Sequence, residues 1–218
     1  MSLKILFIDE LKGFYKSKVM IVLWIGMPLI ALLFHYFQPD TQGFPISSLV
    51  SLIISSIGGT LSSVMLSTSI VNEKNRHVYE LFLIRPVKRR NLLIAKFLAV
   101  YLCLTIAIGI SIGIGIIIDV FINKIPLELN TIFGSLFTSM AIIAISCSLG
   151  TLFGVLVSSV SVAAILSVYL GNQLSAVLIL PTFLLDFMDP LIVSPLLGSF
   201  ITILLMGINI ILFNRQQF

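Results

Sequence analysis

The stretch that decides the fold is Asn72–Lys96, NEKNRHVYELFLIRPVKRRNLLIAK, because it is the one long polar segment in a strongly apolar chain. It holds seven of the thirteen Lys and Arg residues, together with Glu73 and Glu80. Apolar runs flank it on both sides, each longer than the roughly 20 residues that a helix needs to cross a bilayer. A charged segment between two membrane spans lies in water, and its positive excess predicts the cytoplasm.

The composition predicts a single membrane domain over residues 1–218. Hydrophobic residues make up 58% of the chain and charged residues 10%, with a mean hydropathy of +1.16. Soluble domains carry about 25% charged residues. The net charge of +4 reflects basic residues beside apolar spans, so we expect membrane lipid and no nucleic acid as a partner. Cys103 and Cys147 fall inside predicted spans, which indicates neither a disulfide nor a metal site.

Six stretches are long and apolar enough to cross the membrane, which predicts an all-α polytopic fold. They are 19–37, 46–71, 97–118, 132–157, 162–180 and 196–213. With six spans, twelve basic residues fall on one side and only Lys124 on the other, which predicts both termini in the cytoplasm and a multi-pass protein of the cytoplasmic (inner) membrane. A five-span arrangement would move only Arg215 to the other side, so the orientation is better determined than the number of spans.

Two further elements are expected outside the spans. Residues 3–15 place apolar side chains on one helical face and polar ones on the other, so residues 1–18 are predicted to form an amphipathic interfacial helix. That helix is either a membrane anchor alone or an elbow that also touches a cytoplasmic partner. Residues 181–195, PTFLLDFMDPLIVSP, contain three prolines and are too apolar for a solvated loop. We predict a re-entrant outer segment there, with an ordinary outer loop as the alternative.

The sequence predicts no ion-binding, catalytic or ATP-binding site in this chain. Ion-driven transporters keep titratable side chains at mid-membrane, and here the acidic residues and His35 fall near predicted span ends. Intramembrane hydrolases need a nucleophile and base or metal ligands, and two histidines, one in the polar segment, cannot supply them. No Gly-x4-Gly-Lys-Ser/Thr loop is present to hold ATP phosphates. We therefore expect no enzyme activity, no catalytic residue, no metal site and no cofactor in this chain.

Small and polar residues within the spans are candidates for either helix packing or a translocation path. In the second span these are Ser55, Ser56, Gly58, Gly59, Ser62 and Ser63. Gly109/Gly113 and Gly150/Gly154 have the GxxxG spacing, for which close helix packing is the simpler interpretation. In the fifth span Tyr169, Asn172 and Gln173 form one polar turn. Buried amides in lipid are costly unless satisfied, so these side chains face either protein or an aqueous path.

The sequence predicts a short helix from Arg76 to Leu83 within the polar segment. A turn is expected at Arg85-Pro86, because the residue before a proline disfavours the helical conformation. Val78, Tyr79, Leu81, Phe82, Leu83 and Ile84 are too apolar for a loop that meets only water. They predict contact with a protein surface or with lipid headgroups. The simpler alternative is a solvated loop that only sets the topology.

The pattern E-x2-R-x3-E-L-x-L-x-R-P-V-x-R-R-x-L-x-x-x-K, read from Glu73 to Lys96, resembles the signature after the second span of ABC-2 type transporter permeases. The interfacial helix and the six spans with both termini inside also resemble that family. The resemblance implies that residues 72–96 form a coupling helix docked on a separate ATPase subunit. It places the coupling residues at Glu73, Arg76, Glu80, Pro86, Arg89 and Lys96. His77-Val78-Tyr79 replaces the small residue usual in the family, so the resemblance does not extend to the docking contacts of these three positions.

The function implied by this resemblance is that of a permease subunit of an ABC exporter, which works as a homodimer or a heterodimer with a paralogue. ATP and magnesium would be held by the partner ATPase. The path would be lined by Ser55, Ser56, Gly59, Ser62, Ser63, Tyr169, Asn172 and Gln173. An apolar path with these polar groups favours an amphipathic substrate such as a peptide, a drug or a lipid-like molecule. The alternative is a non-transporting membrane scaffold or an immunity-type binding protein that uses the same cytoplasmic loop.

Overall fold

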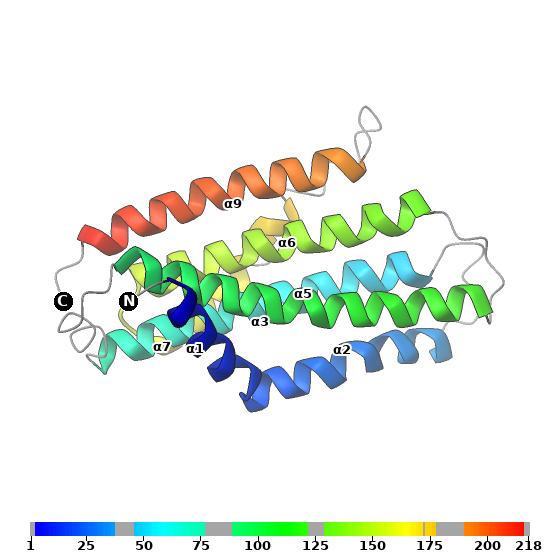
Figure 1. The fold of residues 1–218 in the computed structure, drawn as a ribbon, viewed down its shortest axis with the longest axis horizontal. Helices are drawn as coiled ribbons and strands as arrows, with labels where there is room; N and C mark the ends of the chain where they lie inside the picture. The colour runs from blue at the N-terminus through cyan, green and yellow to red at the C-terminus, as the bar shows by residue number, and fades with distance from the viewer. Residues whose placement is uncertain are drawn as a thin grey trace.

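A computed structural model describes residues 3–37, 46–76, 89–121, 129–171, 173–177 and 190–215. Apart from short links, these residues are helical, and no strand occurs among them. Four long helices form the body of the molecule: α3 (Ile46–Asn75), α5 (Arg89–Phe121), α6 (Leu129–Leu156) and α9 (Pro190–Arg215). They run along the long axis of the molecule, and both chain termini lie at the same end (Figure 1). The all-helical prediction is confirmed for this part of the chain.

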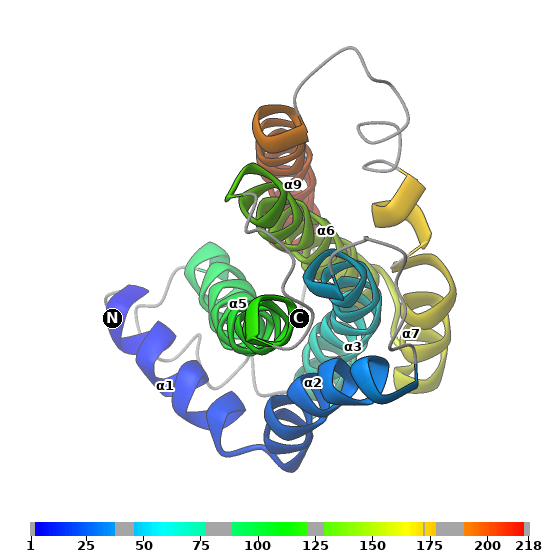
Figure 2. The ribbon, with the colours of Figure 1, turned by 90° about the vertical axis from the view of Figure 1, so that its right-hand side faces the viewer.

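The helices α3 and α6 pack together along their length, with α5 against α3 and α9 against the other side of α6. Seen end-on, α6 lies between α3 and α9, and α5 lies beside α3 (Figure 2). The short helix α7 (Val160–Leu166) continues into η1 (Ser167–Gly171), one turn of π-helix, and both pack on α3. The chain turns from α6 into α7 through three residues, 157–159.

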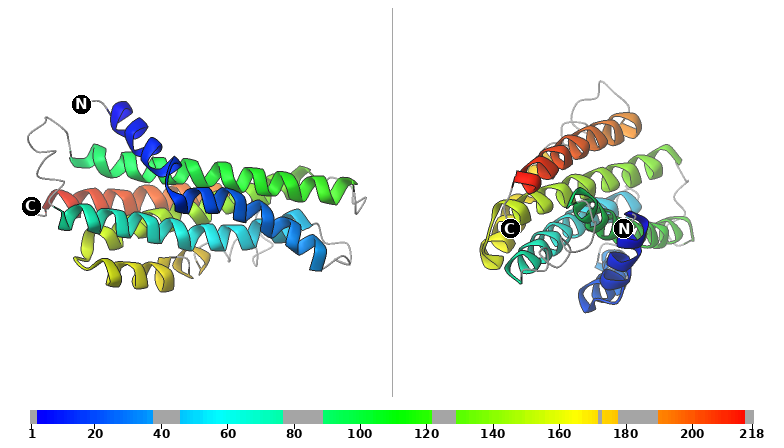
Figure 3. Two further views of the ribbon diagram at one scale, coloured as in Figure 1. Left: turned by 90° about the horizontal axis from the view of Figure 1, so that it is seen from below. Right: turned by 60° about the vertical axis from the view of Figure 1, so that its left-hand side comes forward.

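At the N-terminus, α1 (Leu3–Tyr15) and α2 (Lys18–Phe37) meet at a bend of 67°. The Ser17 hydroxyl accepts a hydrogen bond from the Met20 N–H at 3.2 Å and caps the start of α2. Figure 3 shows α1 crossing the bundle obliquely while α2 follows it. The helix α1 packs on α5 and buries Leu6, with Phe14 at the edge of the core. The helix therefore covers residues 3–15, whose alternating faces predicted it, and its place at the membrane interface stays a prediction.

Five helical segments are long and apolar enough to cross a membrane: Val50–Asn75, Arg90–Phe121, Ile132–Leu156, Val160–Val177 and Leu191–Arg215. The bent pair α1 and α2 would supply a sixth span if it counts as one. A 13-residue helix such as α1 spans only about 20 Å, too little to cross roughly 30 Å of hydrocarbon alone. The described part thus establishes five candidate spans, and the count of six stays a prediction.

Two helices begin before the spans that the sequence predicted. The third span was expected to begin at residue 97, after the coupling segment, but Arg89 and Arg90 of that segment already form the first turn of α5, which has 33 residues. At about 1.5 Å per residue this helix is longer than the hydrocarbon is thick, so it continues into the polar layer. Pro195 was expected to interrupt helix, yet it lies inside α9, which begins at Pro190. Proline at the first helical position is well tolerated, and Pro195 removes only one backbone hydrogen bond in the next turn.

Residues 181–189 of the predicted re-entrant segment lie outside the described residues.

Candidate functional site

A buried ion cluster lies where α1, α3 and α5 meet at the end of the bundle. The Lys96 ammonium group on α5 is 2.8 Å from Oε1 of Glu10 on α1 and 2.5 Å from Oε1 of Glu73 on α3. It also lies 3.5 Å from the Ser69 hydroxyl and 5.9 Å from the centre of the Phe14 ring. One lysine therefore binds the amphipathic helix to the two helices that flank residues 77–88.

The burial of these three charges is unequal. The Lys96 side chain is 2% exposed, whereas those of Glu10 and Glu73 are 21% and 25% exposed. The lysine cannot reach water and depends on its carboxylate partners, while each carboxylate keeps partial contact with solvent. Leaving one buried charge without its partner typically costs about 3–5 kcal/mol. The cluster consequently fixes the relative positions of the three helices.

Further contacts hold the last turn of α3 against α6. The Lys74 ammonium lies 3.4 Å from the Val155 carbonyl oxygen, and the Asn75 side-chain amide donates to the Ser158 carbonyl oxygen at 3.1 Å. This turn of α3 is thus tied to α5 through Glu73, and to α6 and the turn that follows it through Lys74 and Asn75. A movement of residues that follow Asn75 would be passed directly to the bundle.

The predicted coupling residues divide into two groups. The structure brings Glu73 and Lys96 into direct contact inside the bundle, and Arg76 follows α3 with an exposed side chain. Arg89 begins α5, and nothing is described of its side chain. Glu80 and Pro86 lie outside the described residues. Because Lys96 is buried, any role that it has in coupling is that of a positioning residue rather than a contact with a partner.

The predicted path residues lie mostly at helix interfaces within this chain. Ser55, Gly59, Ser62 and Ser63 on α3 are buried, whereas Ser56 is exposed. On η1 and the helical residues 173–177, Tyr169 is 72% exposed and Gln173 is exposed, while Asn172 lies outside the described residues. Whether any of them lines a path stays a prediction.

The close approach of α3, α6 and η1 explains why the buried positions of α3 are small. A Cβ atom on Gly150 would lie 2.6 Å from the Ser63 Cα atom, and one on Gly171 would lie 2.3 Å from the Ser63 hydroxyl oxygen. The Ser67 and Ser167 hydroxyls are 2.8 Å apart across the same interface. The Gly150/Gly154 pair is therefore a packing motif, as the simpler interpretation of its spacing predicted. By contrast, a Cβ on Gly109 or Gly113 would meet no described atom within 4 Å.

Sequence reasoning missed Glu10. It lies four residues from both Leu6, which is buried, and Phe14, which packs on the core, so it shares their helical face. A carboxylate in the middle of an apolar stripe was the signal that a cation would approach from another helix. Burial raises the pKa of the Glu10 carboxyl, and the nearby Lys96 ammonium lowers it only in part. The charged form of Glu10 is therefore held at a net cost, as is common for buried ion pairs.

Residues 36–214 match the family described as ABC-2 family transporter protein. No individual curated protein matches the chain. Because the matched region covers most of the 218 residues, the chain belongs to the ABC-2 transporter family. Together with its long apolar helices, this makes it a multi-pass membrane protein and a component of membrane transport.

Proposed function

We propose that this member of the ABC-2 transporter family is the permease subunit of an exporter in the cytoplasmic membrane, driven by a separate ATPase subunit. Two permease chains, either identical or paralogous, would enclose the path, and both termini would face the cytoplasm. Residues 72–96 would carry the docking surface for the ATPase. ATP and magnesium would be bound by that partner.

The observation that carries the proposal is the buried contact between Lys96, Glu73 and Glu10. The two helices that flank residues 77–88 are α3 and α5, and this cluster joins them to each other and to α1. A segment that receives force from a partner needs rigid attachment on both of its sides. A loop that only set the topology would need no such buried, desolvated connection.

The packing then suggests how movement would spread. A push on residues 77–88 would displace α3 and α5 together, because separating them would break the Glu73–Lys96 contact. The close contact at Gly150 and Gly171 would pass the displacement of α3 to α6 and η1. The π-helical turn is a natural site for adjustment, since such turns are rare and often occur at functional sites. Tyr169 and Gln173 lie on this part of the chain.

The side chains available support the proposed amphipathic substrate. The exposed residues near η1 combine aromatic and aliphatic surface with the Tyr169 hydroxyl and the Gln173 amide. These groups suit an amphipathic molecule such as a peptide, a drug or a lipid-like compound. They offer no charged side chain in the described part of that turn for binding a small ion.

The test is to express the chain with an ATPase subunit, purify the complex and measure ATP hydrolysis and efflux in proteoliposomes. We expect Lys96→Met to retain ATPase association but to lower efflux per ATP hydrolysed, because the flanking helices lose their connection. Lys4→Met is the matched control, since Lys4 is an exposed lysine on α1. If the parent chain neither retains an ATPase nor supports ATP-dependent efflux, the proposal fails, and the non-transporting scaffold becomes the better interpretation.

A further inference from the structure

The corner where α1 meets α2 carries positive charge and apolar surface side by side. Lys12, Lys16 and Lys18 are exposed there, and Tyr15 and Val19 beside them are 56% and 49% exposed. The two helices meet at a bend of 67°, and α1 lies at the rim of the bundle (Figure 2). These five residues are called the corner surface below.

The three lysines of the corner surface have no carboxylate partner in the described part of the chain. Glu10 and Glu73, the carboxylates nearest to the bundle end of α1, are both bound to Lys96. No acidic residue occurs between Leu11 and Phe37. Three positive charges therefore stand together on an outer face of the protein, and the ligand that complements them is an anion.

The apolar part of the corner surface continues along α2. Val22 and Ile25 are exposed, and from Val19 onwards α2 contains no Asp, Glu, Lys or Arg. Such a face is suited to contact with lipid chains. The rings of Tyr15 and Trp24 meet edge to face with their centroids 5.6 Å apart, and these two residue types are enriched where lipid chains meet headgroups. We therefore expect the corner surface at that boundary.

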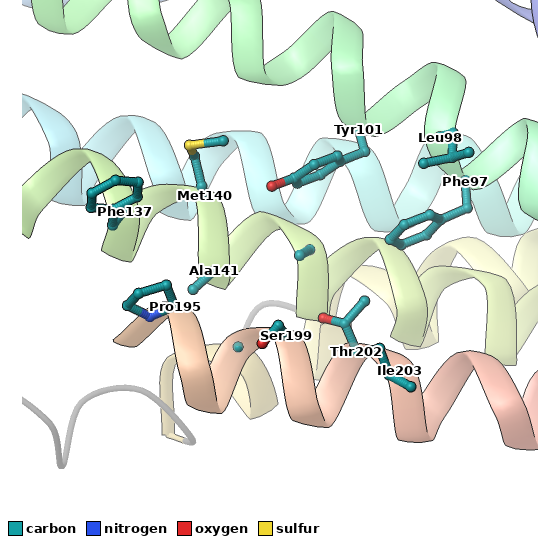
Figure 4. A pocket seen from close by; sticks show the side chains of 12 residues that line it. Phe97, Leu98, Tyr101, Phe137, Met140, Ala141, Pro195, Ser199, Thr202 and Ile203 are labelled. Atoms are coloured by element: carbon teal, nitrogen blue, oxygen red, sulfur yellow. The ribbon is translucent and has the colours of Figure 1, made fainter. Parts of the chain in front are cut away.

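A second apolar surface shows what the charges add. A cavity of about 330 Å³ between α5, α6 and α9 is lined by side chains such as Phe97, Phe137 and Met140 (Figure 4). None of the described residues that line it is charged. Lipid chains can fill such a space, but it has no group that would distinguish one headgroup from another. The corner surface differs, because its apolar side chains stand beside three ammonium groups.

We propose that the corner surface binds an anionic phospholipid, with the headgroup on the three lysines and the chains along Val19 and Val22. Helices that combine basic and apolar side chains in this way bind anionic membranes through both kinds of contact. An acidic face of a soluble protein would match the charges, but it would leave the apolar residues that follow on α2 uncovered. The inner face of α1 is bound to Lys96 through Glu10, so the lipid and the ion cluster hold this helix from opposite sides.

The experiment uses Trp24, the single tryptophan of the chain, as its reporter. The side chain is partly exposed and lies about 9 Å along the helix from Lys18. The purified full chain is reconstituted in dioleoylphosphatidylcholine, and phosphatidylglycerol or phosphatidylcholine with brominated chains is added in increasing fractions. Bromine quenches tryptophan fluorescence on contact, so the two titrations give the relative binding of the two headgroups beside the corner surface.

We expect the brominated phosphatidylglycerol to bind about fivefold more strongly than the brominated phosphatidylcholine, which is the contribution of one lysine near an anionic headgroup. The preference should fall towards one at about 1 M salt, where charges are screened beyond about 3 Å. Soluble glycerol phosphate at the same ionic strength should not compete with the brominated lipid, because it has no chains to contact α2.

One variant removes the charges of the corner surface while leaving its apolar side chains in place. Lys12→Gln, Lys16→Gln and Lys18→Gln together should reduce the preference for phosphatidylglycerol to about one. All three side chains are exposed, so the packing of the bundle does not depend on them. Quenching by brominated phosphatidylcholine should stay as in the native chain, because the apolar contacts are unchanged.

The matched control removes the same charge from exposed positions away from the corner. Arg76→Gln, Arg90→Gln and Arg215→Gln together should keep the fivefold preference. An equal loss in this control would assign the effect to the overall charge of the protein and would overturn the proposal.

Two further results would overturn it. A native chain that shows no preference, or one that salt does not weaken, has no anionic lipid on the corner surface, and this result needs no variant. If the triple lysine variant keeps the preference but no longer retains a co-expressed ATPase subunit, the corner surface binds a protein partner instead. Neither result bears on whether the chain is a permease, because lipid binding is measured without transport.

Discussion

Removing both carboxylates around Lys96 should destabilise the protein by more than the sum of the single changes. Glu10→Gln or Glu73→Gln alone leaves the ammonium one charged partner, so each should cost about 1 kcal/mol, the value of a typical net hydrogen bond. The double variant leaves a charge that is 2% exposed without any carboxylate. We expect it to cost about 3–5 kcal/mol, an excess of about 1–3 kcal/mol over the sum of the singles.

The restoring variant makes this test decisive. Adding Lys96→Met to the double variant replaces the whole cluster by neutral side chains of similar length, and such replacements are often close to neutral for stability. The triple variant should therefore recover most of the loss. The free energy of unfolding would be measured by reversible denaturant titration of the purified chain in mixed micelles. Additive single changes, or a triple variant as unstable as the double, would refute the reasoning.

The pH dependence of Glu10→Gln supplies an independent check. Burial raises the pKa of the Glu10 carboxyl above its ordinary value of 4.5, so the folded chain holds this proton more tightly than the unfolded chain does. Raising the pH through this range therefore lowers the free energy of unfolding of the native protein. Glutamine does not titrate, so the stability of the variant relative to the native chain should improve as the pH rises above the ordinary glutamate pKa of 4.5. A relative stability that falls over this range would contradict the assigned burial.

Three further outcomes are expected. Gly150→Ala should lower the free energy of unfolding by about 1–3 kcal/mol by forcing α3 from α6, whereas Gly109→Ala, whose Cβ meets open space, should not; equal effects would contradict the packing. Glu80→Ala should preserve membrane insertion but weaken ATPase association in pull-down titrations more than tenfold, since a partly desolvated charged contact is worth about 2–5 kcal/mol; unchanged binding would assign the segment to topology alone. Single cysteines at Asn91 and Asp40 should be, respectively, protected from and accessible to an impermeant external reagent in intact cells, and the reverse pattern would invert the proposed orientation.

Much of the helical layout was predictable because apolar length and helix-face periodicity are local properties of the chain. The bounds of Leu3–Tyr15 and the start of Ile46–Asn75 agree with expectation. The helix starts that differ from expectation, at Arg89 and Pro190, belong to helices that begin several residues before the expected spans. Charge and proline content mark where a helix is costly, but packing on neighbours determines whether it forms there.

The candidate site was predictable only in part. The family signature pointed to Glu73 and Lys96, and the two are in contact. It gave no reason to include Glu10, which is more than sixty residues from Glu73 along the chain. It also assigned Lys96 to the coupling surface, while its burial leaves it a positioning role. The cavity between α5, α6 and α9 depends on how far α9 diverges from α5, which no sequence period encodes.

The sequence by itself determined that this chain is a helical membrane protein with one charged segment between two spans, since transfer of apolar and charged groups between water and lipid depends on composition and spacing. Only the tertiary structure decided which polar groups meet. The Lys96 ammonium is paired twice while the Thr202 hydroxyl lacks a described partner. Such pairing depends on the relative rotation and separation of helices, which are fixed where Gly150 meets Ser63 and Gly198 meets Ala141.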